Sequence, residues 1–379
     1  MSLNEHLDAK GAPPDEGAAL LARLHEALCR YVVFPSPEAA DAATLWTAAT
    51  HGQQAWEHAP RLVLTSPEKR CGKSRCQDVI AETGYRPLIT VNATVPAIVR
   101  SLGDDPPTLI VDEADTIFGT KAKADQHEDL RGILNAGHQR NRPMLRWDVT
   151  TRSLERLPTF AMACLASIGD LPDTIMDRAI VVRMRRRAAG EYVAPFRSRR
   201  DGEPLRFIGL DLRAWVGTNL AKLERAVPDM PLEDRAADTW EPLIAVADLA
   251  AGGWPERARK AAKALVEAEE EIEGTRGVLL LEDMHTVFAH NAKMATSIIL
   301  DALTRMEESP WKDINGRGKE LDARGLALRL RPYGIKRKTF RIGGGVYKGY
   351  ELADFQEAWT RYTPDVCDRC TWAIGNIGN

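Results

Sequence analysis

One short loop of the sequence carries residue types that bind phosphate. An apolar run at 61–65 is followed by Ser66 and then by Pro67, Glu68, Lys69, Arg70, Cys71, Gly72, Lys73, Ser74 and Arg75. A loop between a strand and a helix N-terminus points backbone N–H groups at an anion, and the helix dipole adds attraction. Gly72 would let the backbone approach the phosphates, Lys73 would reach the β- and γ-phosphates, and Ser74 would hold Mg²⁺. We therefore predict that residues 67–75 bind ATP with Mg²⁺.

The loop departs from the usual G-x-x-x-x-G-K-[ST] pattern because Pro67 stands where that pattern has its first glycine. A Gly-Lys-Ser triplet alone also fits an ordinary basic loop. A second motif favours the nucleotide interpretation: the apolar run at 108–111 ends in Asp112 and Glu113. Asp112 would bind Mg²⁺ through water, and Glu113 would orient and activate the water that attacks the γ-phosphate.

The elements that position these motifs alternate between short β-rich runs and helical stretches. Such alternation predicts a parallel α/β sheet. We expect strands at 61–65, 88–92, 108–112, 144–149, 159–167 and 179–184. Helices are expected between them near 73–83, 94–102 and 127–139. The fold class is therefore α/β, with a P-loop NTPase core.

Other parts of the chain read as separate regions. Residues 1–60 are helical and Ala-rich, 61–204 form the ATPase core, and 205–273 are helical and would form a lid. Residues 274–363 mix helices with β-rich runs at 326–330, 339–342 and 347–352, and three glycines at 343–345 supply a turn. Helices followed by a β-hairpin suggest a winged-helix-like α+β module. Residues 364–379 form a tail.

Composition excludes several classes of protein. The chain has 379 residues, 44% hydrophobic and 28% charged, so it is neither mostly disordered nor collagen-like. No stretch approaches the roughly 20 apolar residues that span a bilayer, and the N-terminus lacks the pattern of a secretory signal. Six cysteines in so long a chain make no disulfide scaffold. We expect a cytoplasmic protein without a membrane partner.

The segment after the strand at 159–167 resembles AAA+ ATPases. The resemblance implies that Ser167 is the sensor-1 residue at the end of that strand, and that Arg178 is an arginine finger placed against the γ-phosphate of a neighbouring subunit. It also implies that Arg257, after Gly252 and Gly253, is a sensor-2 residue that folds back on the nucleotide. The alternatives are a local surface pair of Asp177 with Arg178 and a solvated arginine at 257.

A longer stretch resembles a family of uncharacterised ATPases from actinobacterial genomes, their prophages and their phages. The resemblance covers about residues 10–360, and the Ser-Pro-Glu loop belongs to that family's own pattern. The segments that carry it read SPEKRCGKSR, LIVDEADTIF, NAGHQRNRPMLR and IGDLPDTIMDRAIVVRMRR. Membership implies a replication ATPase of a phage or mobile element, often encoded beside primase-like genes, so a primase or another replication protein is an expected partner.

Two basic regions are candidates for binding nucleic acid. Arg140 and Arg142 lie in a loop that could face the channel of a ring and follow a phosphate backbone. Residues 311–350 hold eleven Lys or Arg and only three acidic residues, although the whole chain has a net charge of −3. That local excess favours a polyanion, contacted mainly through phosphates. The alternatives are a solvated turn at 140–142 and a basic surface that faces the acidic run at 267–273. The chosen contacts in the second region are Lys336, Arg337, Lys338 and Arg341.

Together these features predict a Mg-ATP-hydrolysing AAA+-type motor, a helicase or translocase that acts on DNA, single-stranded rather than sequence-specific duplex. A finger acting in trans implies a homo-oligomer, and we expect a hexamer. Two other functions stay open: a non-motor ATP switch that loads a helicase or initiates replication, and a nucleotide-gated regulatory or defence ATPase. A motor predicts hydrolysis that rises with single-stranded DNA, whereas a regulator predicts no response.

Overall fold

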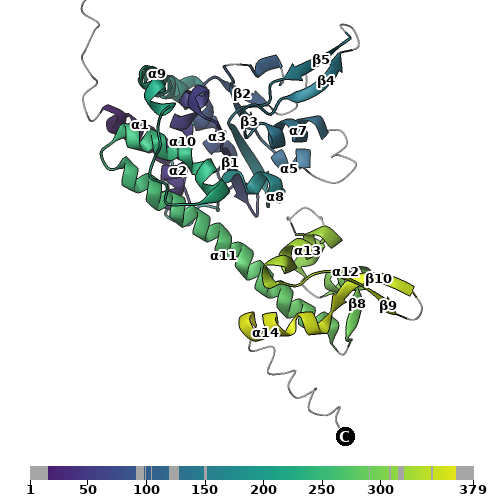
Figure 1. Ribbon diagram of the computed structural model, residues 1–379. Coiled ribbons are helices and arrows are strands. Elements are labelled where there is room, and N and C mark those ends of the chain that lie inside the picture. Colours follow the sequence, from purple (N-terminus) through teal and green to yellow (C-terminus); the bar gives the residue numbers. More distant parts are fainter. Residues whose placement is uncertain are drawn as a thin grey trace, which may run out of the picture. The chain divides into compact units, whose positions relative to one another are not determined.

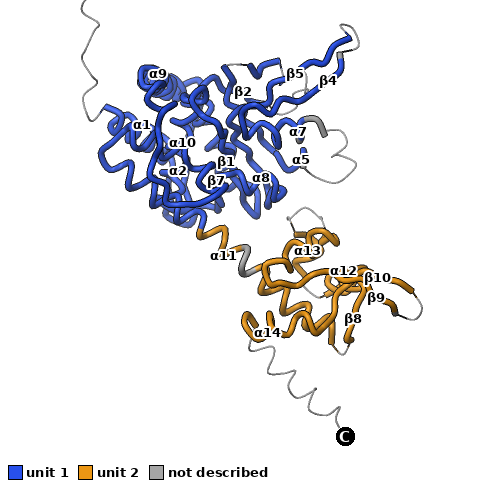
Figure 2. The backbone as a smooth tube through the Cα atoms, viewed as in Figure 1, with its two compact units in different colours: residues 1–266 blue, residues 267–379 orange. Residues whose placement is uncertain are grey.

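The computed structural model describes residues 16–90, 98, 100–103, 105–118, 128–148, 152–289, 291–306, 309–314, 320–342 and 345–363. The chain separates into two compact units, residues 1–266 and 267–379 (Figure 2). Helix α11 (Trp254–Phe288) runs through the boundary between them. The boundary expected from the sequence, between 273 and 274, falls in the same helix.

The first unit is built on a five-stranded parallel sheet in the order β2-β3-β6-β1-β7 (Figure 1). Its strands are β1 (Arg61–Ser66), β2 (Pro87–Thr90), β3 (Thr108–Val111), β6 (Ala163–Ile168) and β7 (Ala179–Arg183). The inner strands β1, β3 and β6 are buried almost throughout and are mostly apolar, as expected for strands covered on both faces. The prediction of a parallel α/β sheet is confirmed. Because all five strands are parallel, their carboxyl ends meet at one edge.

Helices cover both faces of this sheet (Figure 1). One face carries α1 (Glu16–Tyr31), α2 (Pro37–Ala49), α3 (Lys73–Thr83), α9 (Ser198–Leu223) and α10 (Asp234–Ala250), together with the 3₁₀ helix η1 (Thr50–Ala55). The other face carries α5 (Ala114–Phe118), α7 (Glu128–Ala136) and α8 (Asp173–Met176). The side chains of β1 alternate between the two cores, with Leu62 and Leu64 in one and Val63 in the other.

The helices expected as an N-terminal region and a separate lid share one hydrophobic core. Leu24 of α1, Trp46 of α2, Leu212 of α9 and Trp240 of α10 all belong to it. Helix α2 is buried from Ala39 to its end, as its Ala-rich sequence allows. Residues 16–60 and 198–266 therefore form a single helical layer on the sheet.

One expected strand of the sheet lies elsewhere. Residues 144–149 were expected to join the parallel sheet, but β4 (Met144–Asp148) pairs antiparallel with β5 (Ser153–Leu157) in a separate hairpin (Figure 1). The reason is the polarity of the strand. Exposed Leu145 and Trp147 alternate with the charged Arg146, which pairs with Glu155 at 2.7 Å. A strand buried on both faces could not hold that ion pair.

The second unit combines a three-stranded antiparallel sheet with short helices. The sheet has the order β8-β10-β9, from β8 (Lys293–Ala295), β9 (Lys338–Ile342) and β10 (Gly345–Glu351). The end of α11 packs with α12 (Thr296–Arg305), α13 (Ala323–Leu330) and α14 (Gln356–Tyr362) around one core. Three 3₁₀ turns complete it: η2 (Pro310–Lys312), η3 (Arg331–Tyr333) and η4 (Leu352–Asp354).

The β-rich run expected at 326–330 is instead part of helix α13. Asp322 caps this helix, since its carboxylate accepts a hydrogen bond from the Gly325 N–H at 2.7 Å. Leu326 and Leu330, four residues apart, are both fully buried, so the run follows the period of a helix. Apolar content alone made it look like a strand.

The guanidinium of Arg61 connects the amino end of β1 to helix α7 and to the segment before β6. The side chain is only 2% exposed, and it donates to the carbonyl oxygens of Leu134 at 2.8 Å, Ala59 at 3.2 Å, and Ala161. Burial lowers the pKa of Arg61 to about 9, so the group is still charged at neutral pH. A buried charge of this kind is stabilising only while every donor keeps an acceptor.

We therefore expect Arg61→Ala to lower the free energy of unfolding by more than about 3 kcal/mol, because it leaves a cavity and unpaired carbonyl groups. Arg61→Lys should lose less, since an ammonium keeps part of the bonding. Denaturant unfolding of both variants measures the difference. Equal stability of Arg61→Ala and the unmodified chain would contradict this role.

A buried histidine makes the first unit sensitive to acid. His51 is 9% exposed, its Nε2 lies 2.9 Å from the carbonyl oxygen of Thr83, and burial lowers its pKa to about 4. The imidazole is therefore neutral at pH 7 and donates from Nε2. The pKa of His51 is lower in the folded state than in the unfolded state. The contribution of the neutral imidazole to stability is therefore present above pH 6.5 and is lost as the pH falls toward 4.

Replacement of this histidine should remove part of the acid sensitivity. Between pH 7 and pH 4.5 we expect the unmodified chain to lose about 2 kcal/mol more than His51→Gln, which cannot be protonated. Urea unfolding at the two pH values gives the comparison. Parallel losses in the two proteins would show that His51 does not titrate on unfolding.

Candidate nucleotide-binding site

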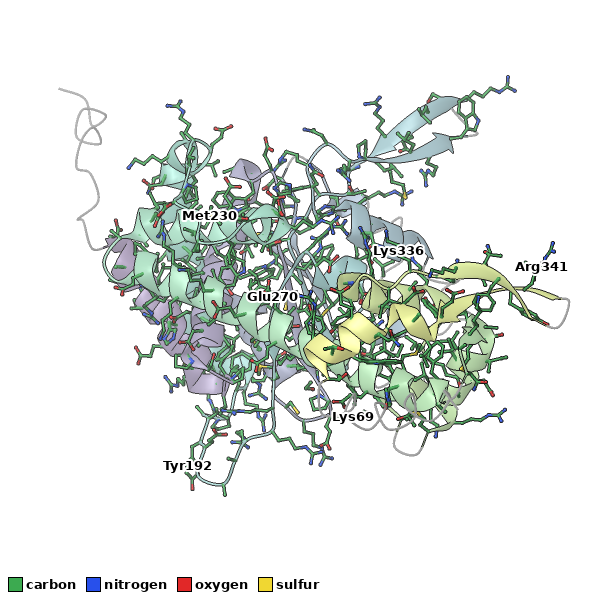
Figure 3. All side chains as sticks on the ribbon, turned by 60° about the horizontal axis from the view of Figure 1, so that its bottom comes forward. Lys69, Tyr192, Met230, Glu270, Lys336 and Arg341 are labelled. Atoms are coloured by element: carbon green, nitrogen blue, oxygen red, sulfur yellow. The ribbon has the colours of Figure 1, made fainter. Side chains whose placement is uncertain are left out.

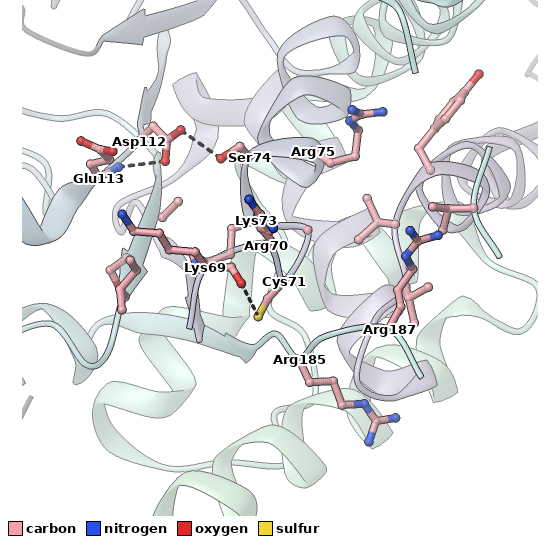
Figure 4. A pocket seen from close by; sticks show the side chains of 18 of the residues that line it. Lys69, Arg70, Cys71, Lys73, Ser74, Arg75, Asp112, Glu113, Arg185 and Arg187 are labelled. Atoms are coloured by element: carbon pink, nitrogen blue, oxygen red, sulfur yellow. Dashed lines mark hydrogen bonds between the residues drawn. The ribbon is translucent and has the colours of Figure 1, made fainter. Parts of the chain in front are cut away.

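A cavity of about 860 Å³ opens at the carboxyl edge of the parallel sheet (Figure 4). Four stretches of chain supply its walls: residues 31–33, 69–75, 112–116 and 166–168. A fifth wall comes from residues 185–195 after β7. Ligands of open parallel sheets bind outside the carboxyl ends of the strands, and this cavity lies there.

The loop that the sequence singled out forms the floor of the cavity. Gly72 has φ 86°, the left-handed region, and caps α3, which begins at Lys73. Arg70 also has a positive φ, 66°. A left-handed glycine at this point turns the chain from β1 into the helix, so the first N–H groups of α3 face the cavity. The thiol of Cys71 is buried against the loop and donates to the carbonyl oxygen of Glu68 at 3.3 Å.

Lys73 lies on this floor, and within the described residues no hydrogen bond or ion pair joins it to a carboxylate. Its ammonium donates to the hydroxyl of Ser66 and to the carbonyl oxygen of Glu68 at 3.3 Å. Burial lowers the pKa of Lys73 below its usual value. A partly desolvated cation of this kind favours an anion beside it, because the anion restores the charged form.

The two halves of the expected metal site meet in the structure. The Ser74 hydroxyl donates to the Asp112 carboxylate at 3.0 Å (Figure 4). Ser74 is the second residue of α3 and Asp112 follows β3, and β6 lies between β1 and β3 in the sheet. Hydroxyl and carboxylate oxygens are the donors that Mg²⁺ prefers, and Mg²⁺ completes its shell with water and phosphate oxygens. The residues present fit that ion.

Glu113 is held in a strained backbone conformation next to this pair. Its φ is 50°, and its N–H is held by the Asp112 carboxylate at 2.8 Å. Its side chain is exposed and lines the cavity. A non-glycine residue in the left-handed region costs about 1 kcal/mol or more, and such strain is concentrated at functional sites. Glu113 is therefore placed to reach a water beside a bound phosphate.

Ser167 also reaches the cavity, from the end of β6. It is 1% exposed, and its hydroxyl donates to the carbonyl oxygen of Gly169 at 2.9 Å. Asp115 lines the same wall, and its carboxylate accepts from the Ile168 N–H at 3.4 Å. These contacts join the segment after β3 to the end of β6.

The wall opposite the loop is largely apolar, and sequence reasoning missed it. Val32 and Val33 follow α1, and Val193 and Pro195 lie in the long segment after β7. The two segments are joined by the Ala194 N–H, which donates to the carbonyl oxygen of Arg30 at 2.8 Å. A cavity with an apolar wall and a floor that carries a lysine and free helix N–H groups suits a ligand that is flat and apolar at one end and anionic at the other.

Arg185 and Arg187 are further lining residues that the sequence analysis did not select (Figure 4). They belong to a basic run, 183–187, directly after the last strand of the sheet. The position of that run at the carboxyl end of a strand could have identified these arginines as lining residues from the sequence. Its neighbour Arg186 points to the loop instead, where it pairs with Glu68 at 2.7 Å.

Two predicted cofactor-binding residues lie outside the cavity. Pro67 and Glu68 are exposed and are not among the described residues that line it, which begin at Lys69. Glu68 contributes by its ion pair with Arg186 and by its carbonyl oxygen, which accepts from Lys73. We therefore correct the prediction that Pro67 and Glu68 bind the cofactor directly. The contacts of Glu68 stabilise the loop instead.

The predicted sensor-2 residue is not brought to the cavity. Arg257, on α11, donates to both carboxylate oxygens of Asp41 on α2, from Nε at 3.0 Å and from Nη2. Its guanidinium lies 3.9 Å from the ring centre of Trp254, and Asp41 also faces His25 at 3.3 Å. Since Asp41 is buried, Arg257 neutralises its charge and links the helices. We correct this prediction to a structural role.

The loop expected to follow DNA is also bound into the fold. Arg140 donates from Nε to the Trp56 carbonyl oxygen at 2.9 Å and from Nη2 to that of Gln53 at 2.6 Å, and it covers the ring of Phe160 at 4.1 Å. These contacts anchor η1 to the segment before β6. We correct the DNA-binding prediction for Arg140, because its donors serve the protein interior.

Arg178 lies at the opposite edge of the sheet from the cavity. It directly precedes β7, and its carbonyl oxygen accepts from the N–H of Arg61 at the start of β1, at 3.1 Å. Its guanidinium donates to the Thr174 carbonyl oxygen at 2.6 Å. Asp177 pairs with Arg235 at 3.2 Å, not with Arg178. Arg142, predicted to contact DNA, lines the same small hollow as Arg178.

The four basic residues chosen in the second unit are all exposed. Lys336 and Arg337 precede β9, while Lys338 and Arg341 belong to it. Arg341 extends outward from the β9–β10 hairpin (Figure 3). Lys338 is committed to the protein, since its ammonium pairs with Asp354 at 2.7 Å and with Glu351 at 3.2 Å. We therefore correct the prediction for Lys338, because a DNA phosphate could bind its ammonium only by displacing the two carboxylates.

Some predictions fall outside the described residues: most of the helix at 94–102, the turn glycines 343 and 344, and the tail at 364–379. Within the described residues, no helix is both long enough and apolar enough to cross a bilayer.

Comparisons with solved structures give only weak likenesses. The apo A form of the NrS-1 C-terminal region is 9% identical with a TM-score of 0.32, covering 90% of this chain and 76% of that one. A full-length MCM homologue from Methanopyrus kandleri is 14% identical with a TM-score of 0.39, covering 68% of this chain and 62% of that one. Both scores are below 0.5, so neither supports an argument.

Comparisons of sequence are more informative. Residues 183–362 match the family model described as "Protein of unknown function (DUF3631)". Over 184 residues the chain is 46% identical to an "Uncharacterized 28.9 kDa protein in xis 5'region" from Saccharopolyspora erythraea. The match covers 48% of this chain and 69% of that protein. The chain therefore belongs to the family of this Saccharopolyspora erythraea protein.

Proposed function

We propose that this chain is an ATPase of the AAA+ type that hydrolyses Mg-ATP and acts on DNA as a helicase or translocase in the replication of a phage, prophage or other mobile element. The observation that carries the ATPase part is the meeting of Ser74 with Asp112 beside Lys73, on a helix that begins at a left-handed glycine. The DNA and mobile-element parts extend the resemblance described above.

In this proposal the loop binds the triphosphate and the apolar wall receives the base. Mg²⁺, when bound, neutralises phosphate charge and orients the β- and γ-phosphates. Lys73 exchanges its contacts with Ser66 and Glu68 for phosphate oxygens, and the negative charge beside it offsets the lowering of its pKa by burial. The N–H groups at the start of α3 donate to the same phosphates. Glu113 positions the attacking water.

The proposed finger must act on another copy of the chain. Arg178 and the phosphate loop lie at opposite ends of the strands, and the five residues of β7 span about 16 Å. An arginine side chain cannot reach across that length to its own cavity. A site completed by a second copy implies a heterologous, head-to-tail assembly, which closes into a ring when the rotation permits. A hexamer remains our expectation for that assembly.

The β4–β5 hairpin is the surface of the first unit that best suits single-stranded DNA. Its register puts Leu145, Trp147, Leu154 and Arg156 on one face, and the three apolar members are 55–60% exposed. Bases stack on exposed aromatic rings, and arginine contacts both bases and phosphates. The hairpin thus replaces Arg140 as our candidate for DNA contact in this unit. Lys336, Arg337 and Arg341 are candidates in the second unit, whose helices and hairpin we propose to be a winged-helix module.

A helicase loader or initiator is the second candidate function. The exposed basic β9–β10 hairpin, with Arg341 and Lys348, would mark DNA without any movement along it. This candidate shares the ATPase site and differs in its response to DNA: slow turnover that single-stranded DNA does not change. The ATP hydrolysis of a regulatory or defence ATPase would also not change with DNA. Such a protein would be distinguished from a loader by the partner that it binds.

The first measurement is steady-state ATP hydrolysis by the full chain with Mg²⁺. Lys73→Ala and Glu113→Gln should each reduce the rate about 100-fold or more, because each removes a group that acts on the phosphate or the water. Lys222→Ala, an exposed lysine on α9, is the matched control and should leave the rate unchanged. An unmodified chain that neither binds nor hydrolyses ATP would overturn the proposed function.

The same assay with single-stranded DNA separates a motor from a switch. We expect DNA to stimulate hydrolysis, and Trp147→Ala to remove most of the stimulation while the rate without DNA stays the same. Phe207→Ala is a matched control, since Phe207 is 55% exposed on α9. Hydrolysis that ignores DNA in the unmodified chain would exclude the motor and favour the loader or regulator.

A further inference from the structure

A second hollow, of about 250 Å³, lies at the amino edge of the parallel sheet. It opens where β1 and β7 begin, the opposite end from the nucleotide cavity. Its walls come from segments 58–60, 138–142, residue 178 and the start of α10. Three of its lining side chains are arginines, namely Arg142, Arg178 and Arg235.

Among the residues that line the hollow, three arginines stand against one carboxylate, that of Asp238. Burial lowers the pKa of Arg178, and the nearby Arg235 and Arg142 lower it further, so the three cations repel one another. His138 adds no charge at neutral pH, since burial lowers its pKa to about 4. Two carboxylates oppose the arginines: Asp177, which pairs with Arg235 at 3.2 Å, and Asp238, which lies 3.8 Å from His58.

Clustered guanidinium groups around a small concave space favour one compact anion. A phosphate group accepts several charge-assisted hydrogen bonds from such groups and relieves their mutual repulsion. The backbone of a nucleic acid presents a row of phosphates and needs an extended groove, whereas this hollow measures only about 250 Å³. The shape therefore favours a terminal phosphate.

The phosphate must come from another molecule, because the strands separate the hollow from the phosphate loop of the same chain. We propose that Arg142 and Arg235 act together with Arg178 on the terminal phosphate of a nucleotide held in the cavity of a second copy of this chain. This inference rests on the proposed ATPase function. It assigns to the partner site two arginines to which the resemblance gave no role at the nucleotide.

Geometry supports the grouping of the three residues. Arg178 is fixed by its bond to Thr174 and by the pairing of β7 with β1. Arg142 is held by its backbone, since its carbonyl oxygen accepts from the Thr159 hydroxyl at 2.7 Å. Arg235 stands in the first turn of α10 and is oriented by Asp177. Three different elements thus present guanidinium groups to one space.

The first test compares single variants in the ATPase assay. Arg142→Ala and Arg235→Ala should each lower the rate about 10-fold or more, as loss of a transition-state contact does. Arg225→Ala, an exposed arginine just beyond α9, is the matched control. Asp177→Asn removes the carboxylate charge but keeps an amide oxygen that can accept the hydrogen bond of Arg235, so it should retain most of the activity. Loss of activity in Asp177→Asn equal to that in Arg235→Ala would indicate a structural ion pair and overturn the proposal.

The second test asks whether the arginines act between copies. Glu113→Gln lacks a working cavity but keeps its arginines, and Arg235→Ala has the reverse defect. In an equal mixture, random head-to-tail assembly restores about one quarter of the contacts and hence about one quarter of the unmodified rate. A mixture of Glu113→Gln with Lys73→Ala has no intact cavity and should recover nothing.

The outcomes separate the two proposals. Recovery in the first mixture alone supports the inference, and folding of each variant is checked by its thermal unfolding. A mixture no more active than the mean of its two components overturns the action between copies. Absence of hydrolysis in the unmodified chain overturns the proposed function itself, and the inference with it.

Discussion

The candidate site depends on the turn between β1 and α3. β1 lies inside the sheet, paired with β6 on one side and β7 on the other, so its carboxyl end has one position only. From that end the chain must start a helix within a few residues, and the left-handed conformation of Gly72 makes this geometry accessible without strain. Every other group of the cavity is placed relative to that helix start: Ser74 reaches Asp112 because α3 begins where it does. The buried charge of Arg61 serves the same strand at its other end.

Sequence reasoning succeeded where the signal is local. Apolar runs and the residues that follow them identified the strands of the sheet and the helix at 73–83, because strands buried on both faces are mostly apolar. It failed where the spacing of the apolar residues and the exposure of the segment differ from what its composition suggests. The run at 144–149 has strand propensity but an exposed, alternating pattern, so it forms a hairpin outside the sheet. The run at 326–330 is apolar with the period of a helix and was mistaken for a strand.

Part of the site could be predicted from the sequence for the same reason. Lys73, Ser74, Asp112 and Glu113 belong to continuous motifs, and the structure brings them together. Arginines have no such motif, since an always-charged donor suits interior carbonyl groups, buried carboxylates and phosphates equally well. The partner of Arg257 is Asp41, 216 residues away, and no spacing rule connects the two. Arginine positions in this chain are thus decided by tertiary contacts.

The cavity has one consequence for the energetics of the whole first unit. Its walls come from the end of α1, the loop before α3, the turn after β3, the end of β6 and the segment after β7, and the first and last of these are joined by the Ala194–Arg30 bond. A ligand that touches all five loses contacts when any one of them unfolds. Binding of such a ligand therefore stabilises these segments together, across more than 160 residues of sequence, by RT ln(1 + [L]/Kd). If the ligand is the nucleotide that we propose, the ratio of its cellular concentration to its dissociation constant would set how often this unit opens to proteases, and energy supply and protein lifetime would be linked through the same five segments.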